Sequence, residues 1–230
     1  MRNPHWPSTA RRRLWTLAAT AILLISVQSF AASADDPLTQ VHDGLNQVIA
    51  IFHKKDASLA ARREQLRNLA EQHFDFTDMA KSVLGYHWRA LTPAQRADFV
   101  PLFTGFIESA FLSKLQDYTV QKIRQETQAA KIDYLRESFD GLTYVEVFTD
   151  ITVPEQKEPL HINYLMHHID GSWRIYDISV DAISIMANYR NQFDRVINNQ
   201  GYDQLVAIMK EKQKQIREHM ENPGQAAAGS

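Results

Sequence analysis

Cysteine is absent from all 230 residues of the chain. Its absence excludes disulfide bonds, a lipid-modified cysteine and a thiolate metal site. The fold must therefore be held together by packing and hydrogen bonds alone.

Sequence motifs for catalysis and metal binding are also absent. The chain has no dinucleotide-binding glycine motif, no P-loop, no nucleophile elbow and no His-Glu-x-x-His. His161 and His167 share a face of a predicted strand but are about 20 Å apart, too far for one metal ion. Asp177 and Asp181 could serve as catalytic carboxylates, but capping the next helix or pairing with Arg190 is the expected role. The sequence thus predicts no enzyme, no metal site and no cofactor.

Long apolar runs are confined to the N-terminus. Arg11, Arg12 and Arg13 precede the apolar segment 14–27, and Ala32-Ser33-Ala34 has the small-x-small pattern of a cleavage site. The run is shorter than the roughly 20 residues of a membrane span. We expect residues 1–34 to be a signal peptide cleaved near Ala34, with an uncleaved anchor and twin-arginine export as alternatives.

Positive charge is scarce after the predicted cleavage site. Four of the 25 basic residues and none of the 27 acidic residues lie in residues 1–34, which leaves 21 against 27, a net charge of −6. Nucleic acid requires a basic surface, so it is not an expected partner. The remaining length suits one domain over residues 35–220, followed by a disordered tail at 221–230.

The first half of the expected domain has helical periodicity. Apolar stripes predict helices at 38–52, at 59–69 with Asp56 as its cap, and from Phe76 to Val83. Thr92-Pro93-Ala94-Gln95 is a capping box that starts a further helix, which Pro101 should kink or divide.

The middle of the chain has strand periodicity. Short connections containing Asp-Gly or proline separate four predicted strands, at 131–138, 142–153, 160–169 and 172–180. Connections this short favour an antiparallel meander. Helices before and after a contiguous sheet predict an α+β fold in which helices wrap a four-stranded sheet.

The stretch from Gly171 to Phe193 joins the last strand to a helix. In the strand, Trp173 and Ile175 should lie on one face, and Ile178 and Val180 on the other. A helix is predicted from Ile183 to Ile197, and another follows Gly201.

Several segments resemble the MlaC or toluene-tolerance family of periplasmic proteins, in the family's order, over roughly residues 38–212. The segments are Phe74-Asp75-Phe76, Met79-Ala80, Leu84-Gly85, Trp88, Thr92 to Arg96 followed by Phe99, and Trp173 to Phe193. Proteins of this family carry phospholipid between the two membranes of Gram-negative bacteria. The resemblance implies a curved sheet wrapped by helices, akin to nuclear-transport-factor-2-like cones, with an apolar lipid cavity.

The same resemblance implies phospholipid as cargo and docking partners at both membranes. The implied partners are an inner-membrane ABC transporter with an MCE-domain ring and an outer-membrane complex of a lipoprotein with a porin. The expected function is therefore that of a soluble periplasmic carrier that maintains outer-membrane lipid asymmetry. A hopanoid carrier of the same family, and a cone-fold enzyme of the ketosteroid-isomerase type, are the alternatives.

Within that frame, lipid tails are expected between one sheet face and the helices that begin near Pro93 and Ile183. Apolar residues on these elements are usually core, so their assignment to a cavity rests on the resemblance. The expected lining residues are Phe103, Phe106, Ile107, Phe111, Val145, Val147, Ile151, Ile162, Tyr164, Met166, Ile183 and Met186. Arg190 could contact a lipid phosphate, although an ion pair with Asp177 or Asp181 is the expected role.

Overall fold

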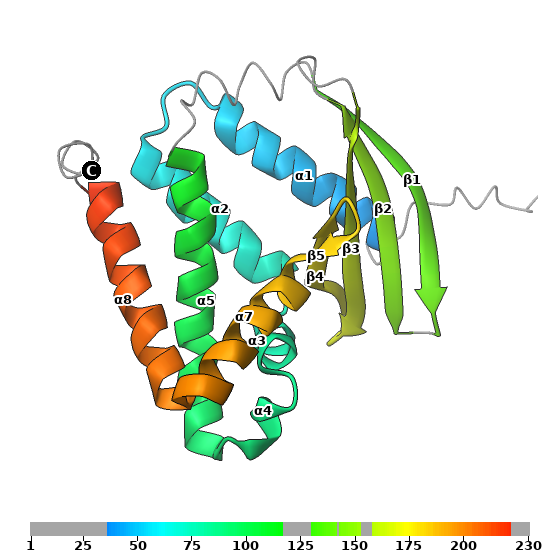
Figure 1. Ribbon diagram of the computed structural model, residues 1–230. Helices are drawn as coiled ribbons and strands as arrows, with labels where there is room; N and C mark the ends of the chain where they lie inside the picture. The colour runs from blue at the N-terminus through cyan, green and yellow to red at the C-terminus, as the bar shows by residue number, and fades with distance from the viewer. Residues whose placement is uncertain (1–35, 117–129, 142, 153–157, 222–230) are drawn as a thin grey trace, which may run out of the picture. The chain divides into compact units, whose positions relative to one another are not determined.

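The computed structural model describes residues 36–116, 130–141, 143–152 and 158–221. The predicted signal peptide and most of the predicted tail lie outside these residues. Residues Ala34–Ser230 make up one compact unit. Its elements, labelled in Figure 1, are α1 (Pro37–His53), α2 (Leu59–His73), α3 (Phe76–Leu84), α4 (His87–Ala90), α5 (Pro93–Gln116), β1 (Lys131–Asp140), β2 (Tyr144–Thr152), β3 (Leu160–Ile169), β4 (Ser172–Val180), β5 (Ile183–Ser184), α7 (Ile185–Gln200) and α8 (Tyr202–Glu221).

Polar side chains begin the N-terminal helices. The Asp36 carboxylate accepts a hydrogen bond from the Thr39 amide at 2.8 Å, and Ser58, not the predicted Asp56, caps α2. The capping box at α5 is confirmed, because Gln95 accepts from the Thr92 amide at 2.9 Å and Thr92 accepts from the Gln95 amide at 3.2 Å.

Pro101 does not divide α5, which runs from Pro93 to Gln116 as one helix. Phe99 and Phe103, on either side of the proline, are both fully buried. Their packing on neighbouring helices outweighs the hydrogen bond that proline cannot donate.

The sheet is an antiparallel meander of five strands in the order β1-β2-β3-β4-β5, one more than predicted. Asp181 and Ala182 have φ of 48° and 64° and form a two-residue turn, so Ile183 and Ser184 pair back onto β4 as β5. The predicted helix therefore begins at Ile185, with Ser184 as its cap.

A register shift in β4 corrects the predicted alternation of side chains. Leu165 pairs with Asp177 but Met166 pairs with Ile175, so Tyr176 is an extra residue on β4. The bulge brings Ile178 into the same cluster as Trp173 and Ile175, which simple alternation placed on the opposite face. Asp177 and Ser179 become the buried side chains of the other face.

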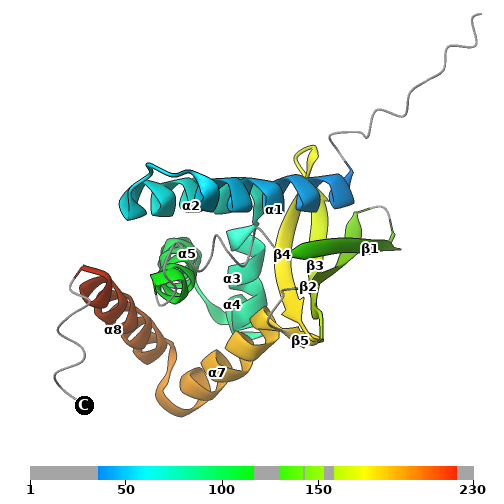
Figure 2. The same cartoon turned by 90° about the horizontal axis from the view of Figure 1, so that it is seen from above.

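Helix α1 covers one face of the sheet (Figure 2). Its Val41 packs into a cluster with side chains of β2, β3 and β4, namely Val145, Val147, Tyr164, Met166, Trp173 and Ile175. Glu137 of β1 accepts a hydrogen bond from the Leu38 amide at 2.9 Å, which fixes the start of α1 to the sheet. Burial raises the pKa of the Glu137 carboxyl.

A second core lies among α3, α5, α7 and α8. Its fully buried members include Leu84, Phe99, Phe103 and Met186. Phe74 packs against both this cluster and the sheet cluster, so it joins the two cores.

Arg62 is a buried charge that sequence patterns did not predict. Its side chain is 2 % exposed, and its guanidinium donates to the backbone oxygens of Ile51, of Phe52 at 3.1 Å and of Lys54 at 2.5 Å. These carbonyls end α1 and have no partner within the helix. A cation at a helix C-terminus is also favourable for the helix dipole.

We predict that Arg62→Met lowers the free energy of unfolding by about 3 kcal/mol, because buried carbonyls lose their donor. Urea unfolding measures this change. Arg217→Met removes the charge of an exposed arginine on α8, and should alter stability by less than about 0.5 kcal/mol. Equal stability of the two variants would show that Arg62 does not hold the α1 terminus.

Candidate functional site

A groove of about 710 Å³ lies between α5, α7 and α8, at the end of β4. We call it the α7–α8 groove; the helices around it are seen in Figure 2. Its volume falls within the roughly 300–1,000 Å³ of small-molecule sites. Its lining residues are Phe106, Ala110, Val180, Asp181, Ile183, Ser184, Ile185, Asn188, Tyr189, Gln192, Phe193, Val196, Leu205, Ile208, Met209, Lys212 and Ile216.

Three aromatic rings from α5 and α7 form one wall of the groove. The Tyr189 ring centroid lies 5.8 Å from that of Phe106 and 5.9 Å from that of Phe193. Burial raises the pKa of the Tyr189 phenol. Leu205 and Met209 of α8, each 1 % exposed, supply the apolar floor. The wall and floor present mainly hydrocarbon to a ligand.

The end of the groove near the sheet is more open and more polar. Ile183 is 67 % exposed, although it lines the groove next to Asp181 and Ser184. Lys212 contributes a basic side chain to the lining. An amphipathic ligand would find apolar and polar surfaces in one groove.

The position of α7, and hence of the groove wall, depends on Asp177. This buried carboxylate accepts hydrogen bonds from the Ser184 hydroxyl at 2.5 Å and from the Met186 amide at 3.1 Å. Ser184 in turn accepts from the Ala187 amide at 2.9 Å. Asp177 therefore supports the start of α7 from β4, beside the cap residue Ser184, which is close to the capping role expected of an acid in this stretch.

The expected ion pair between Arg190 and Asp177 or Asp181 is wrong. Arg190 faces α3 and donates to the backbone oxygen of Ser82 at 2.5 Å and to its hydroxyl at 2.7 Å. Asp181 accepts instead from the His161 amide at 3.2 Å.

The predicted lining residues divide between two clusters and do not surround one cavity. Phe106 and Ile183 line the α7–α8 groove. Phe103, Ile107 and Met186 belong to the helical core, of which Phe106 is also a member, but do not line the groove. Phe111 of α5 belongs to neither group, because its side chain is 56 % exposed.

The sheet residues of the prediction lie beneath α1 instead of facing α5 and α7. Val145, Val147, Tyr164 and Met166 are buried there, and Ile162 packs against them. Ile151, near the end of β2, is half-buried. Strand alternation showed that these residues share a face, but it could not show which helix covers that face.

Sequence reasoning missed the contribution of α8. Leu205, Met209, Lys212 and Ile216 recur at steps of three and four, which is a readable helical stripe. The stripe indicates a helix face but does not name the partner, so its approach to α5 and α7 was not predicted.

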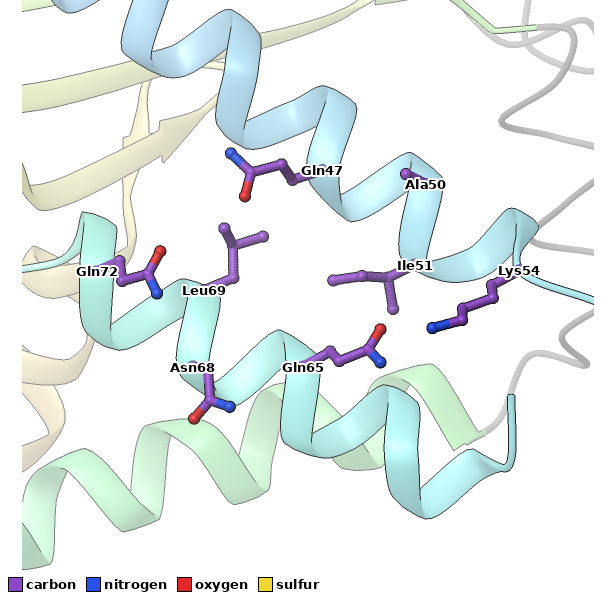
Figure 3. A pocket seen from close by; sticks show the side chains of 8 residues that line it. All are labelled: Gln47, Ala50, Ile51, Lys54, Gln65, Asn68, Leu69 and Gln72. Carbon is purple, nitrogen blue, oxygen red and sulfur yellow. The ribbon is translucent and has the colours of Figure 1, made fainter. Parts of the chain in front are cut away.

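A second hollow of about 390 Å³ lies between α1 and α2 (Figure 3). It is lined by polar and apolar side chains, namely Gln47, Ala50, Ile51, Lys54, Gln65, Asn68, Leu69 and Gln72. Four amides and a lysine suit hydrogen-bonding groups better than hydrocarbon, so this hollow is a poorer match for an apolar ligand.

Asp75, Asp78 and His167 lie close enough to be considered as metal ligands, with their ligand atoms within 4.8 Å of one another. However, His167 Nε2 lies 3.0 Å from Asp75 and Nδ1 lies 3.4 Å from Asp78, so its two nitrogens face different carboxylates. Lys81 also donates to Asp78 at 2.8 Å. The arrangement is that of a polar network joining β3 to α3, at a helix N-terminus that favours anions.

A family model and a characterised protein that match this chain both carry the name MlaC. The family model described as "MlaC protein" matches residues 42–211. The chain is 23 % identical over 210 residues to the Intermembrane phospholipid transport system binding protein MlaC of Haemophilus influenzae, covering 89 % of this chain and 94 % of that protein.

A solved structure supports the fold. The phospholipid-binding protein from Ralstonia solanacearum, determined in complex with a phospholipid, superimposes with a TM-score of 0.64 at 19 % identity. The match covers 78 % of this chain and 98 % of the Ralstonia chain. Because the family model spans most of the described residues, the chain belongs to the MlaC family.

Proposed function

We propose that this protein is a periplasmic phospholipid carrier that holds acyl chains in the α7–α8 groove. The observation that carries the proposal is a groove of about 710 Å³ with an aromatic and aliphatic lining in a member of the MlaC family. The name of the Haemophilus relative and the phospholipid bound to the Ralstonia protein support it.

The physical need for such a groove follows from the cost of exposing hydrocarbon. A diacyl lipid has on the order of 30 methylene and methyl groups, each costing about 0.8 kcal/mol in water. A groove that replaces the bilayer interior removes most of this cost, so transfer between membrane and carrier becomes nearly balanced. The carrier needs no reaction of its own to perform this task.

Tails in the groove would first contact Phe106, Tyr189 and Ile183. Phe103, Ile107 and Met186 lie in the same cluster as Phe106 and Tyr189, so a modest separation of α5 from α7 would add these residues to the lining. Val145, Val147, Ile162, Tyr164 and Met166 could contact a tail only if α1 moved away from the sheet. Ile151 and Phe111 do not line the groove.

The headgroup is proposed to lie at the polar rim. Asp181, Ser184, Asn188, Gln192 and Lys212 all line the groove, and Lys212 offers a cation for a phosphate. Arg190 does not line the groove and is hydrogen-bonded to Ser82, so the phosphate contact considered for it is not part of this proposal.

An enzyme of the ketosteroid-isomerase type is less well supported than a carrier. Such an enzyme needs a carboxylate available as a base in its pocket. Asp177 does not line the groove, and its carboxylate orients α7 through Ser184 and Met186. Asp181 does line the groove, but it is exposed and accepts a hydrogen bond from the His161 amide, so it is not a desolvated base deep in the pocket.

Transport between membranes also needs partners that set direction. We propose the two implied by family membership, an ABC transporter with an MCE-domain ring at the inner membrane and a lipoprotein–porin complex at the outer membrane. A carrier with a nearly balanced binding equilibrium supplies no directional energy, so the maintenance of outer-membrane asymmetry would depend on these complexes.

We predict that the chain from Ala34 onward, purified from a Gram-negative host, contains bound phospholipid. Organic extraction followed by mass spectrometry measures the lipid and its amount per protein. Hopanoid in place of phospholipid would support the alternative cargo. Protein that carries neither lipid, even after incubation with phospholipid vesicles, would contradict the carrier function.

We predict that Ala110→Trp lowers bound lipid several-fold while the fold is retained, because the indole occupies groove volume and not a packed core. The measurements are lipid per protein and the circular dichroism spectrum. The matched control is Ala187→Trp, at an exposed position of α7 outside the groove lining. Unchanged lipid in a folded Ala110→Trp protein would place the tails elsewhere.

A further inference from the structure

The turn that contains α4 carries aromatic and basic residues. Hydrogen bonds from Tyr86 to Asn198 and between His87 and Asp194 hold this turn beside α7; Figure 1 shows the course of both segments. We define the aromatic–basic patch as Tyr86, Trp88, Arg89, Arg96 and Arg190. Tyr86 is 65 % exposed, Arg89 is exposed and Trp88 is half-buried. None of the five residues lines the α7–α8 groove or the α1–α2 hollow.

Contacts link Arg96 to Trp88 and Arg89, and Arg190 lies against Gly85, the neighbour of Tyr86 in the chain. The Arg96 guanidinium lies 5.6 Å from the centroid of Trp88 and donates to the backbone oxygens of Trp88 and Arg89, both at 3.1 Å. On the other side, the Arg190 side chain passes 3.5 Å from the point where a Cβ on Gly85 would lie. Gly85 has φ of 53° and ends α3, so a side chain there would be strained as well as crowded.

The three arginines of the patch carry positive charge that no carboxylate offsets directly. Within the described ranges, no ion pair joins Arg89, Arg96 or Arg190 to an acid, since Arg96 and Arg190 donate to carbonyl and hydroxyl oxygens. Elsewhere, Arg67 pairs with Glu64 and Glu108. The acid beside the patch, Asp194, lies 2.9 Å from His87 Nε2. Three arginines without an ion pair among the described residues thus lie together on a chain whose formal net charge is −2, with Asp194 hydrogen-bonded to Tyr86 beside them.

We infer that the aromatic–basic patch binds the surface of an anionic phospholipid membrane. Tyrosine and tryptophan prefer the membrane interface because one end of each ring is apolar and the other polar. Arginines beside them are attracted to anionic headgroups. A fluid lipid surface can adapt to five side chains, whereas a stable protein interface needs about 20–30 residues a side.

Helix α7 connects this patch to the proposed lipid groove. Arg190, Asp194 and Asn198 follow one another at four-residue steps and contact Ser82, His87 and Tyr86, respectively. Tyr189, Phe193 and Val196 line the groove from a neighbouring stripe. Docking through the patch would bring the groove helix to the bilayer surface. The inference does not depend on the groove holding lipid, since the patch would bind headgroups in either case.

The test is co-sedimentation of the chain from Ala34 onward with two kinds of vesicle, phosphatidylcholine alone and equal parts phosphatidylcholine and phosphatidylglycerol. We predict binding to the anionic vesicles that weakens as salt is added. Arg89→Gln removes one positive charge and should weaken binding to the anionic vesicles about fivefold. Arg89→Glu changes the charge by two and should weaken this binding about 25-fold. Arg89 is the best position to change because, among the residues that the structure describes, its side chain makes no hydrogen bond or ion pair to another element.

Arg217→Gln is the matched control, because it removes the same charge from an exposed site on α8. Its position is about 22 Å along the helix from Tyr202, whose hydroxyl donates to the Gln95 carbonyl near the patch. The control should bind like the unaltered chain. Three results would overturn the inference. They are equal binding to both vesicle types, equal losses in Arg89→Gln and Arg217→Gln, and no vesicle binding at all, as expected if the patch binds an acidic protein. Lipid extracted from the unaltered chain tests the groove separately.

Discussion

The buried carboxylate of Asp177 connects the sheet to the helices that form the candidate site. It accepts hydrogen bonds from the Ser184 hydroxyl and the Met186 amide. These bonds fix the first turn of α7 to β4. Tyr189, Phe193 and Val196 follow on that helix and supply one wall of the groove. If α7 left β4 at another angle, these side chains would no longer oppose Leu205 and Met209 of α8.

This chain has no cysteine, so no disulfide can connect its elements. Polar and charged side chains make some of these connections instead. Arg62 binds the last carbonyls of α1, and Arg174 of β4 donates to the carbonyls of Glu71 and Gln72 at the end of α2. His167 joins β3 to the two acids at the start of α3. None of these contacts involves a residue that lines the groove, whose lining is mainly hydrocarbon.

Lipid binding and membrane contact would use different faces of α7. The groove requires apolar side chains that can give way to a tail, whereas the aromatic–basic patch requires exposed charges held in a fixed arrangement. Arg96 and Arg190 meet this second requirement through hydrogen bonds to carbonyl oxygens, which orient the guanidinium groups without neutralising them. Helix α7 would therefore line the lipid groove with one face and contribute Arg190 to the membrane-binding patch with another.

The sequence by itself determined the α+β class, the meander, the capping box at Thr92 and the family, because each depends on local spacing or on residues in a fixed order. It also identified the apolar residues, but periodicity could not say which helix covers which face. Only the tertiary structure placed α1 over Val147 and Tyr164, brought α8 to the groove, and moved Ile178 to the face of Trp173 through the bulge at Tyr176. Burial of Arg62 and the gathering of three arginines around α4 were likewise decided by contacts between distant segments, which no single stretch of sequence contains.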